Sequence, residues 1–214
     1  MDEAPGSDGD FAPAAFFAVA RQRLLAEPPD ETVTAIGDHV LNPDFLVADA
    51  KYQEAAVLIP VMARTPAATV LLTRRMPHLS AHAGQVAFPG GKIDRADGGP
   101  AAAALREAGE EIGLDPAAVS IVGYLDPYIS RTGYRIVPVL GRVEPDPPLR
   151  LNRAEVEAAF EVPLAFLMAP ANHRRTSRVF RGRTRYFYEM PYGEHHIWGV
   201  TAGIIRGLYE RIFG

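Results

Sequence analysis

Three glutamates, Glu107, Glu110 and Glu111, lie close together in the segment FPGGKIDRADGGPAAAALREAGEEIGL, which runs from Phe88 to Leu114. In a helix of 3.6 residues per turn, their spacing places all three on one face. Like charges at this spacing repel each other, at a cost of roughly 0.2–0.5 kcal/mol per pair. Carboxylate oxygens are also the ligands that Mg²⁺ and Mn²⁺ prefer. The pattern therefore has two interpretations, a solvated acidic helix face or a site for a divalent cation.

The helix that carries these glutamates has clear boundary signals. Pro100 falls in its first turn, and Gly113 stands where a glycine commonly ends a helix. The opposite side is expected to pack on a sheet, because it carries apolar residues at helical spacing. These residues are Ala101, Ala104, Leu105, Ala108 and Ile112.

The rest of the chain alternates between helical and extended patterns. We expect helices over 14–27 and 198–213, and a short helix over 153–160. We expect a hairpin of strands 54–64 and 69–75, a short strand in 85–91, strands in 119–130 and 134–143, and a hairpin over 178–190. The simplest domain organisation that we expect is a disordered tail (1–13), an N-terminal helix and connector (14–50) and one mixed α/β domain (51–214).

Composition narrows the classes of protein. Of 214 residues, 48% are hydrophobic and 22% are charged, which is typical of a globular protein. The chain has no cysteine, which excludes disulfides and thiolate chemistry. No apolar run reaches the ~20 residues of a membrane span, and the acidic start MDEAPGSDGD is unlike a signal peptide. We expect a cytoplasmic protein, and the net charge of −4 argues against nucleic acid as its partner.

The segment around the glutamates resembles the signature of the Nudix hydrolases, G-x5-E-x7-R-E-U-x-E-E-x-G-U, where U is aliphatic. The matching positions are Gly91, Arg106, Glu107, Glu110, Glu111, Gly113 and Leu114. Asp97 replaces the first glutamate, eight residues rather than seven separate it from Arg106, and Ala108 is small for the aliphatic position. These departures are similar to those of one subgroup, the coenzyme A pyrophosphatases, in which GGKxDxxD precedes REAxEEIGL.

A lead-in segment strengthens the likeness to this subgroup. LLTRRMPHLSAHAGQVAFPGG, from Leu71 to Gly91, looks like the subgroup's own motif. The marked positions are Arg74, His82, Gly84, Gln85, Phe88, Pro89, Gly90 and Gly91. The segments LNRAEVEAAFEVPLAFLM and HIWGVTAGII are also similar, so the resemblance covers roughly residues 50–210.

The resemblance implies an α/β fold, an α/β/α sandwich around a mixed sheet. It also implies metal-dependent hydrolysis of coenzyme A or its derivatives to 3′,5′-ADP and (acyl-)4′-phosphopantetheine. With Mg²⁺ or Mn²⁺ as cofactor, Glu107 and Glu111 would be the main ligands, and Glu110 a third ligand or a supporting carboxylate. Arg106 would orient a glutamate through a bidentate ion pair.

The expected substrate contacts lie mostly in the lead-in segment. They are Arg74, His82, Gln85, Phe88, Gly90, Gly91 and Arg131. Asp97 is interpreted as steadying the glycine loop rather than as a ligand. Glu155 and Glu157 are candidates to complete the metal site, and the general base stays unassigned between a glutamate of the helix and a distant acid. The arginine-rich run 173–185 fits either an exposed hairpin or a site for the 3′-phosphate.

Alternatives remain open at this point. The same fold and metal site would suit ADP-ribose, a reduced dinucleotide or capped RNA. A non-catalytic Nudix-fold ligand-binding module is a further alternative, although the full set of three glutamates argues against it. The expected partner is a small nucleotide substrate, and the sequence leaves monomer and homodimer open.

Overall fold

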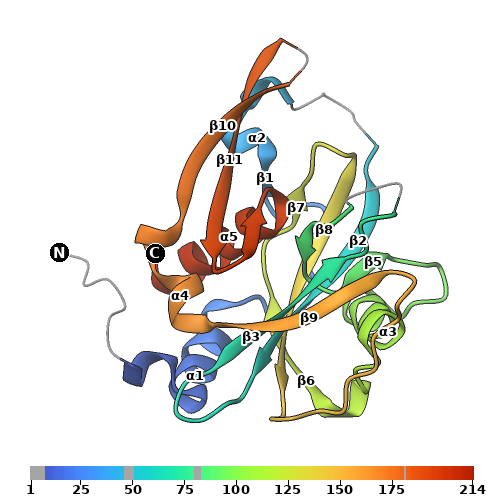
Figure 1. Cartoon of the computed structure of the whole chain (residues 1–214), viewed down its shortest axis with the longest axis vertical. Coiled ribbons are helices and arrows are strands. Elements are labelled where there is room, and N and C mark those ends of the chain that lie inside the picture. The colour runs from blue at the N-terminus through green and yellow to red at the C-terminus, as the bar shows by residue number, and fades with distance from the viewer. Residues whose placement is uncertain (1–7, 46–50, 80–82, 181) are drawn as a thin grey trace.

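The computed structural model describes residues 8–45, 51–79, 83–180 and 182–214 (Figure 1). Its helices are α1 Pro13–Arg23, α2 Asp38–Leu41, α3 Pro100–Ile112, α4 Leu164–Met168 and α5 Val200–Phe213. Its strands are β1 Ile36–Gly37, β2 Gln53–Met62, β3 Thr69–Arg75, β4 Val86–Ala87, β5 Gly90–Lys92, β6 Val119–Tyr124, β7 Tyr128–Ile129, β8 Tyr134–Val143, β9 Val156–Pro163, β10 Arg174–Phe180, β11 Arg183–Tyr192 and β12 His195–Trp198.

A mixed sheet forms the centre of the molecule. Its strand order is β1-β7-β8-β2-β3-β4, with β5 beside β2, β6 beside β8 and β9 beside β3. Strands β2 and β8 are parallel along their whole length, whereas β2 pairs antiparallel with both β3 and β5. The expected β2–β3 hairpin is confirmed, but it pairs only at Val61 and Met62 of β2. The N-terminal half of β2 is therefore left to pair with the glycine strand β5, which contacts α3.

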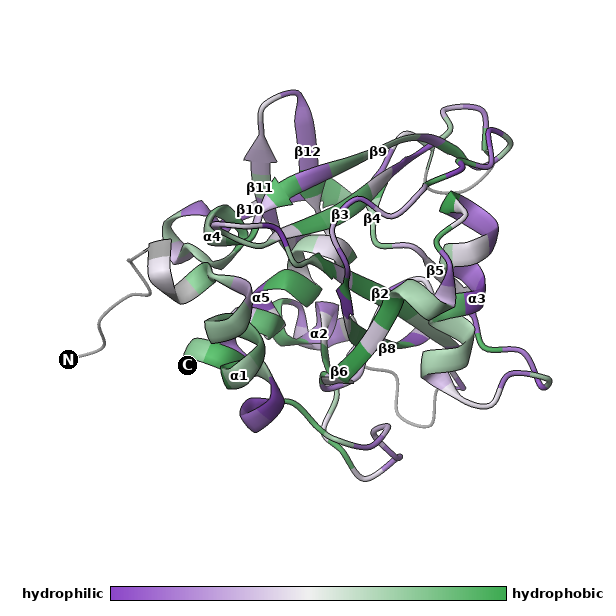
Figure 2. Cartoon of the chain, turned by 90° about the horizontal axis from the view of Figure 1, so that it is seen from below, coloured by the Kyte–Doolittle hydropathy of each residue, from purple (hydrophilic) through white to green (hydrophobic). Residues whose placement is uncertain are grey.

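Helices cover both faces of this sheet. Successive side chains of a strand point to opposite faces, and β2 follows this rule. Ala55 and Ile59 pack in the core that includes α1 and α5, whereas Ala56 and Leu58 pack in the core that includes α3. Apolar residues accordingly concentrate in the central strands (Figure 2). The fold is the expected α/β/α sandwich around a mixed sheet.

The N-terminal helix belongs to the core. Helix α1 ends at Arg23, before the expected end at residue 27, and it buries Phe16 and Phe17. The expected disordered tail is wrong for residues 8–13, since Phe11 is only 3% exposed and its ring packs against that of Phe213. Residues 1–7 lie outside the described part of the chain. Burial of aromatic side chains explains why the ordered domain begins earlier than composition indicates.

The expected short helix over 153–160 is also wrong. These residues lead into strand β9, which pairs antiparallel with β3 from Val156 to Pro163. Phe160 and Val162 pack in the same core on either side of Glu161, as alternate residues of a strand do, and the backbone of β3 supplies the hydrogen-bond partners. The C-terminal helix α5 is confirmed, with Ile204, Ile205, Leu208 and Ile212 buried.

A smaller sheet of β10, β11 and β12 packs against α5. The expected hairpin over 178–190 is confirmed and is longer than expected, beginning at Arg174. Its residue Arg181 lies outside the described part of the chain. Met190 and Ile197 are paired across β11 and β12 and are fully buried, so this face of the small sheet belongs to the main core. The opposite face carries Arg178 and Trp198.

Candidate functional site

Helix α3 has the boundaries that its sequence predicts. It begins at Pro100, and Gly113 closes it with a φ of 67°. That left-handed conformation costs glycine little, which explains why the helix ends there. The buried stripe contains Ala104 and Ala108, and it continues into Glu111 one turn later. One of the three glutamates therefore lies on the packed side of the helix.

The three carboxylates differ in exposure. The side chain of Glu111 is 4% exposed, that of Glu107 is 18% exposed and that of Glu110 is 58% exposed. The three glutamates are thus not uniformly solvated, which argues against the interpretation that they only form a solvated acidic face of the helix. Removing a carboxylate from water without full compensation is costly, and natural proteins mostly avoid it outside functional sites.

Glu111 is the most perturbed of the three. Burial raises its pKa to about 7, helped by the nearby charges of Glu107 and Glu155 and opposed by Arg75 and the backbone of Gly90. The guanidinium of Arg75 lies 3.5 Å from Oε1, whereas the buried Oε2 has no hydrogen-bond partner. A buried carboxylate oxygen without a partner is suited to a ligand that brings positive charge.

Glu107 lies directly against the glycine loop. A Cβ atom at Gly91 would lie 2.5 Å from Cδ of Glu107, so only glycine lets the carboxylate approach this closely. Burial raises the pKa of Glu107, with opposition from Arg106. The neighbouring Gly90 is required for a different reason, because its Cβ would lie 2.4 Å from the carbonyl oxygen of Ala56. Because neither position has space for a Cβ atom, the two glycines allow the loop to pass closely between β2 and α3.

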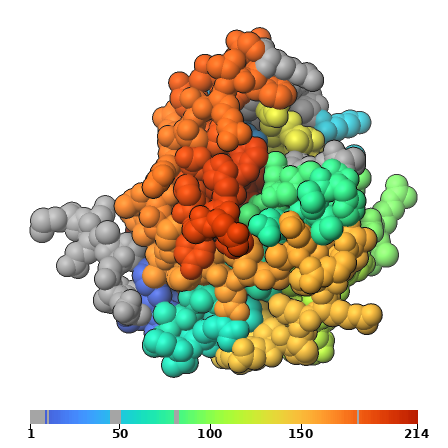
Figure 3. All heavy atoms as spheres, in the orientation of Figure 1, coloured from blue at the N-terminus to red at the C-terminus, as the bar shows by residue number. Residues whose placement is uncertain are grey.

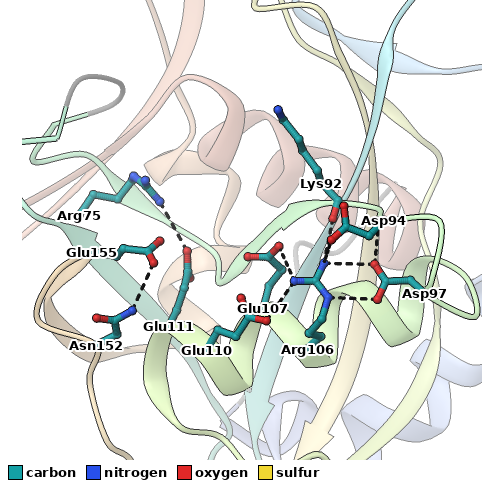
Figure 4. Close-up of polar contacts among 10 residues, drawn as sticks. All are labelled: Arg75, Lys92, Asp94, Asp97, Arg106, Glu107, Glu110, Glu111, Asn152 and Glu155. Carbon is teal, nitrogen blue, oxygen red and sulfur yellow. Dashed lines mark hydrogen bonds and ion pairs between the residues drawn. The ribbon is translucent and has the colours of Figure 1, made fainter.

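Arg106 connects the helix to the loop (Figure 4). Its Nε and Nη2 each lie 3.1 Å from an oxygen of Asp97, and Nη2 also donates to the carbonyl of Lys92. Nη1 donates to Glu107 at 2.9 Å and to Glu110 at 3.3 Å. The bidentate pair is therefore made with Asp97, not with a glutamate as expected. The replacement of glutamate by Asp97 preserves an anion that Arg106 can hold.

Asp97 has a second contact that fits its expected role. Its Oδ2 accepts a hydrogen bond from the amide of Asp94 at 2.8 Å, which closes the turn before α3. Arg106 lowers the pKa of Asp97, so this carboxylate is ionised at neutral pH. The turn and the helix are in this way fixed to each other on the side away from Glu111.

Glu155 and Glu157 have different surroundings. Glu155 lies close enough to raise the pKa of both Glu107 and Glu111, and its Oε1 accepts a hydrogen bond from Asn152. Glu157 instead pairs with Arg74 at 3.0 Å. Of the two candidates, only Glu155 is placed beside the glutamate cluster.

The carboxylates do not form a complete cation site in their present positions. Among the described residues, no three acidic or imidazole side chains converge closely enough to hold an ion as they stand. The reason is visible in Figure 4, since Arg106 draws Glu107 and Glu110 to one side while Arg75 approaches Glu111. The carboxylate chemistry, the raised pKa values and the unpartnered Oε2 of Glu111 nevertheless fit Mg²⁺ or Mn²⁺.

Two of the expected substrate contacts line a pocket of about 300 Å³. Arg74 and Gln85 meet Glu194, His195 and Trp198 there. Sequence reasoning did not assign Glu194, His195 or Trp198, although Trp198 belongs to the stretch HIWGVTAGII, from His196 to Ile205, that resembles the subgroup. Two adjacent histidines followed by the tryptophan were the available signal.

The remaining expected contacts are distributed differently. The side chain of Phe88 is 5% exposed and packs in the core, and its expected contact with substrate stays a prediction. The guanidinium of Arg131 stacks over Phe180 at 4.5 Å, at the tip of the small sheet. His82 lies outside the described residues.

No helix within the described residues is long and apolar enough to cross a bilayer.

Comparison with known proteins identifies the family. Residues 51–181 match the NUDIX domain. The chain is 44% identical over 173 residues to the uncharacterized Nudix hydrolase NudL of Escherichia coli K12, covering 81% of this chain and 90% of NudL, and NudL of Shigella boydii serotype 4 matches equally. The crystal structure of DR0079 from Deinococcus radiodurans aligns with a TM-score of 0.48 at 14% identity, over 81% of this chain and 96% of that one. This chain belongs to the Nudix hydrolase family.

Proposed function

We propose that this Nudix hydrolase cleaves the diphosphate bond of coenzyme A or its derivatives, releasing 3′,5′-ADP and (acyl-)4′-phosphopantetheine. The reaction would depend on Mg²⁺ or Mn²⁺ held by Glu107, Glu110 and Glu111, and Glu155 is a further carboxylate beside them. The observation that carries the proposal is the buried, unpartnered Oε2 of Glu111 in a cluster of mutually repelling acids. A cation is the partner that this arrangement lacks.

Each side chain of the cluster has a distinct task in this proposal. A divalent cation supplies charge neutralisation for the diphosphate and activation of a water molecule. Glu107 and Glu111, the two more buried glutamates, would be the main ligands of the cation, and the more exposed Glu110 would be a third ligand or a supporting carboxylate. Arg106 and Asp97 fix the loop to the helix, so that the glycines of the loop stay beside the glutamates.

The coenzyme A assignment rests on the lead-in segment from Leu71 to Gly91. One end of this segment places Gly91 against Glu107, and the other places Arg74 in the pocket beside β12. A substrate bound along it would have its diphosphate at the carboxylates and another group in the pocket. This layout suits a long molecule that carries chemical groups on both sides of a central diphosphate.

A substrate panel tests the proposal. Purified protein is incubated with coenzyme A, ADP-ribose, reduced dinucleotide and capped RNA, with Mg²⁺ or Mn²⁺ and with EDTA, and products are identified by mass. We expect 3′,5′-ADP and 4′-phosphopantetheine from coenzyme A, and no turnover with EDTA. ADP-ribose cleaved far faster than coenzyme A would overturn the substrate assignment while leaving the metal site intact.

A variant pair tests the metal site itself. Glu111→Gln is expected to reduce kcat by orders of magnitude with the fold intact, because it keeps the shape of the side chain but removes its charge. Glu210→Gln is the matched control, since Glu210 forms an exposed pair with Arg206 on α5. Wild-type turnover in Glu111→Gln would remove Glu111 from the mechanism.

A further inference from the structure

A pocket of about 300 Å³ lies where β12 packs against β4 and the end of β3. In Figure 3 the orange-red surface of β11 and β12 borders the green surface of the segment that follows β3. The volume is at the lower end of the range of ligand pockets, roughly 300–1,000 Å³. It can hold one part of a nucleotide substrate, not a complete dinucleotide or coenzyme.

Aromatic rings form one wall of this pocket. His196 and Trp198 are two residues apart on β12, so their side chains project from the same face of the small sheet. Their rings are stacked, with centroids 6.1 Å apart and an interplanar angle of 15°. The ring of Phe187 meets Trp198 edge-on at 5.4 Å. These contacts hold the rings of His196 and Trp198 nearly parallel and fix their orientation.

Polar contacts keep this surface in place and surround it with charge. Nε2 of His196 lies 2.9 Å from a carboxylate oxygen of Glu189, and the side chain of His196 is still 41% exposed. The guanidinium of Arg178 lies 5.5 Å from the centre of the Trp198 ring. Glu194 lines the same pocket and brings a carboxylate that accepts hydrogen bonds from an amino group.

Two adjacent residues at the end of β3 connect the pocket to the carboxylate cluster. Arg74 lines the pocket, whereas the next residue, Arg75, reaches Glu111. Consecutive Cα atoms are about 3.8 Å apart, and consecutive strand side chains point to opposite faces. The two sites therefore lie on either side of the end of β3. A substrate whose diphosphate lies at the proposed cation site of Glu107 and Glu111 can extend over this end into the pocket.

We propose that this pocket binds the nucleobase of the substrate's nucleotide half, stacked on the pair of parallel rings that His196 and Trp198 form. The inference rests on the proposed function, in which that base is adenine. Flat π surfaces bind nucleobases by stacking, and each stacked base changes affinity by roughly ten-fold or more when the ring is removed. Glu194 accepts a hydrogen bond from the exocyclic amine, and Arg178 supplies positive charge for phosphate on the same nucleotide.

The protein contains one tryptophan, so its fluorescence reports on this pocket alone. Wild-type protein in EDTA is titrated with AMP and with ribose 5-phosphate, with excitation at the red edge of the tryptophan band, where adenine does not absorb. We expect saturable quenching by AMP and none by ribose 5-phosphate. Absence of quenching by AMP, or equal quenching by ribose 5-phosphate, would overturn the proposal.

Variants give an independent readout by calorimetry. Trp198→Ala is expected to weaken AMP binding about ten-fold or more, and Trp198→Phe to retain most of it because it keeps a ring. Tyr186→Ala is the matched control, since Tyr186 is an exposed aromatic residue of the same sheet that lies outside the pocket. Equal loss of affinity in Trp198→Phe and Trp198→Ala, or a similar loss in Tyr186→Ala, would contradict stacking.

The two proposals can fail separately. If coenzyme A is hydrolysed but AMP neither quenches Trp198 nor loses affinity in Trp198→Ala, the pocket assignment is wrong and the proposed function stands. If AMP binds as expected but coenzyme A is not cleaved, the base pocket stands and the substrate belongs to another class of nucleoside diphosphate.

Discussion

Gly91 and Gly90 are adjacent, yet alanine should mainly impair catalysis at Gly91 and mainly reduce stability at Gly90. In Gly91→Ala the new Cβ would lie 2.5–2.6 Å from the carboxylate atoms of Glu107. Ordinary contact begins at 3.4 Å, so the carboxylate must retreat by the difference between 3.4 and 2.5 Å, or about 0.9 Å. The atoms that must move are the end of a flexible side chain. The fold should therefore tolerate the change, with a stability change within about 1 kcal/mol.

The displaced carboxylate should disturb catalysis strongly. A misplacement of about 1 Å in a catalytic site can reduce the rate about 100-fold, which corresponds to about 2.7 kcal/mol of transition-state stabilisation. We expect Gly91→Ala to lose about this factor in kcat/KM and to bind Mn²⁺ more weakly. Steady-state kinetics and electron paramagnetic resonance of free Mn²⁺ measure the two effects.

Gly90→Ala serves as the matched comparison. Its Cβ would lie 2.4 Å from the carbonyl oxygen of Ala56 and 2.7 Å from Cα of Val57, which are backbone atoms in the middle of the sheet. Relief requires strand β5 to separate from β2, so we expect a loss of stability of roughly 2–4 kcal/mol in chemical denaturation. Wild-type kcat/KM and Mn²⁺ affinity in Gly91→Ala would refute the argument, as would unfolding of Gly91→Ala to the same extent as Gly90→Ala.

Three further predictions concern charged groups. In EDTA, Glu111→Gln should be at least as resistant to thermal unfolding as the wild type, because it removes a buried charge; a lower melting temperature would contradict this. Arg106→Lys should lower kcat/KM by roughly 10- to 100-fold at unchanged stability, since lysine cannot bind Asp97 in a bidentate manner. Unchanged kinetics would show that the contact between Arg106 and Asp97 does not affect catalysis. Burial lowers the pKa of His173, so the unfolded chain takes up a proton that the folded protein resists. Stability should therefore decline as the pH falls below about 6.5, and this decline should be smaller in His173→Gln when denaturation is followed across pH.

Sequence patterns correctly predicted those features of the fold that depend on residues close together in the chain. Pro100 and Gly113 mark the ends of α3 because their backbone preferences act within one turn. The common face of the three glutamates follows from helical periodicity alone. The same holds for the buried side of α5, in which Ile204, Ile205 and Leu208 recur at helical spacing.

Contacts between distant segments decided the remainder. Residues 156–163 form a strand because β3 offers an unpaired edge, a fact that no local pattern contains. The partner of Arg106 is Asp97 because the loop returns to the helix, and Glu111 is buried because Arg75 and the glycine loop cover it.

Spacing alone thus indicated which residues belong together, namely the glutamates of one helix face. Only the tertiary structure determined their environments, from the exposed Glu110 to the buried Glu111. It likewise brought Arg74 and Trp198 into one pocket although more than a hundred residues separate them in the chain. The physical reason is that helix geometry repeats every few residues, whereas burial and electrostatic environment depend on which distant surfaces pack together.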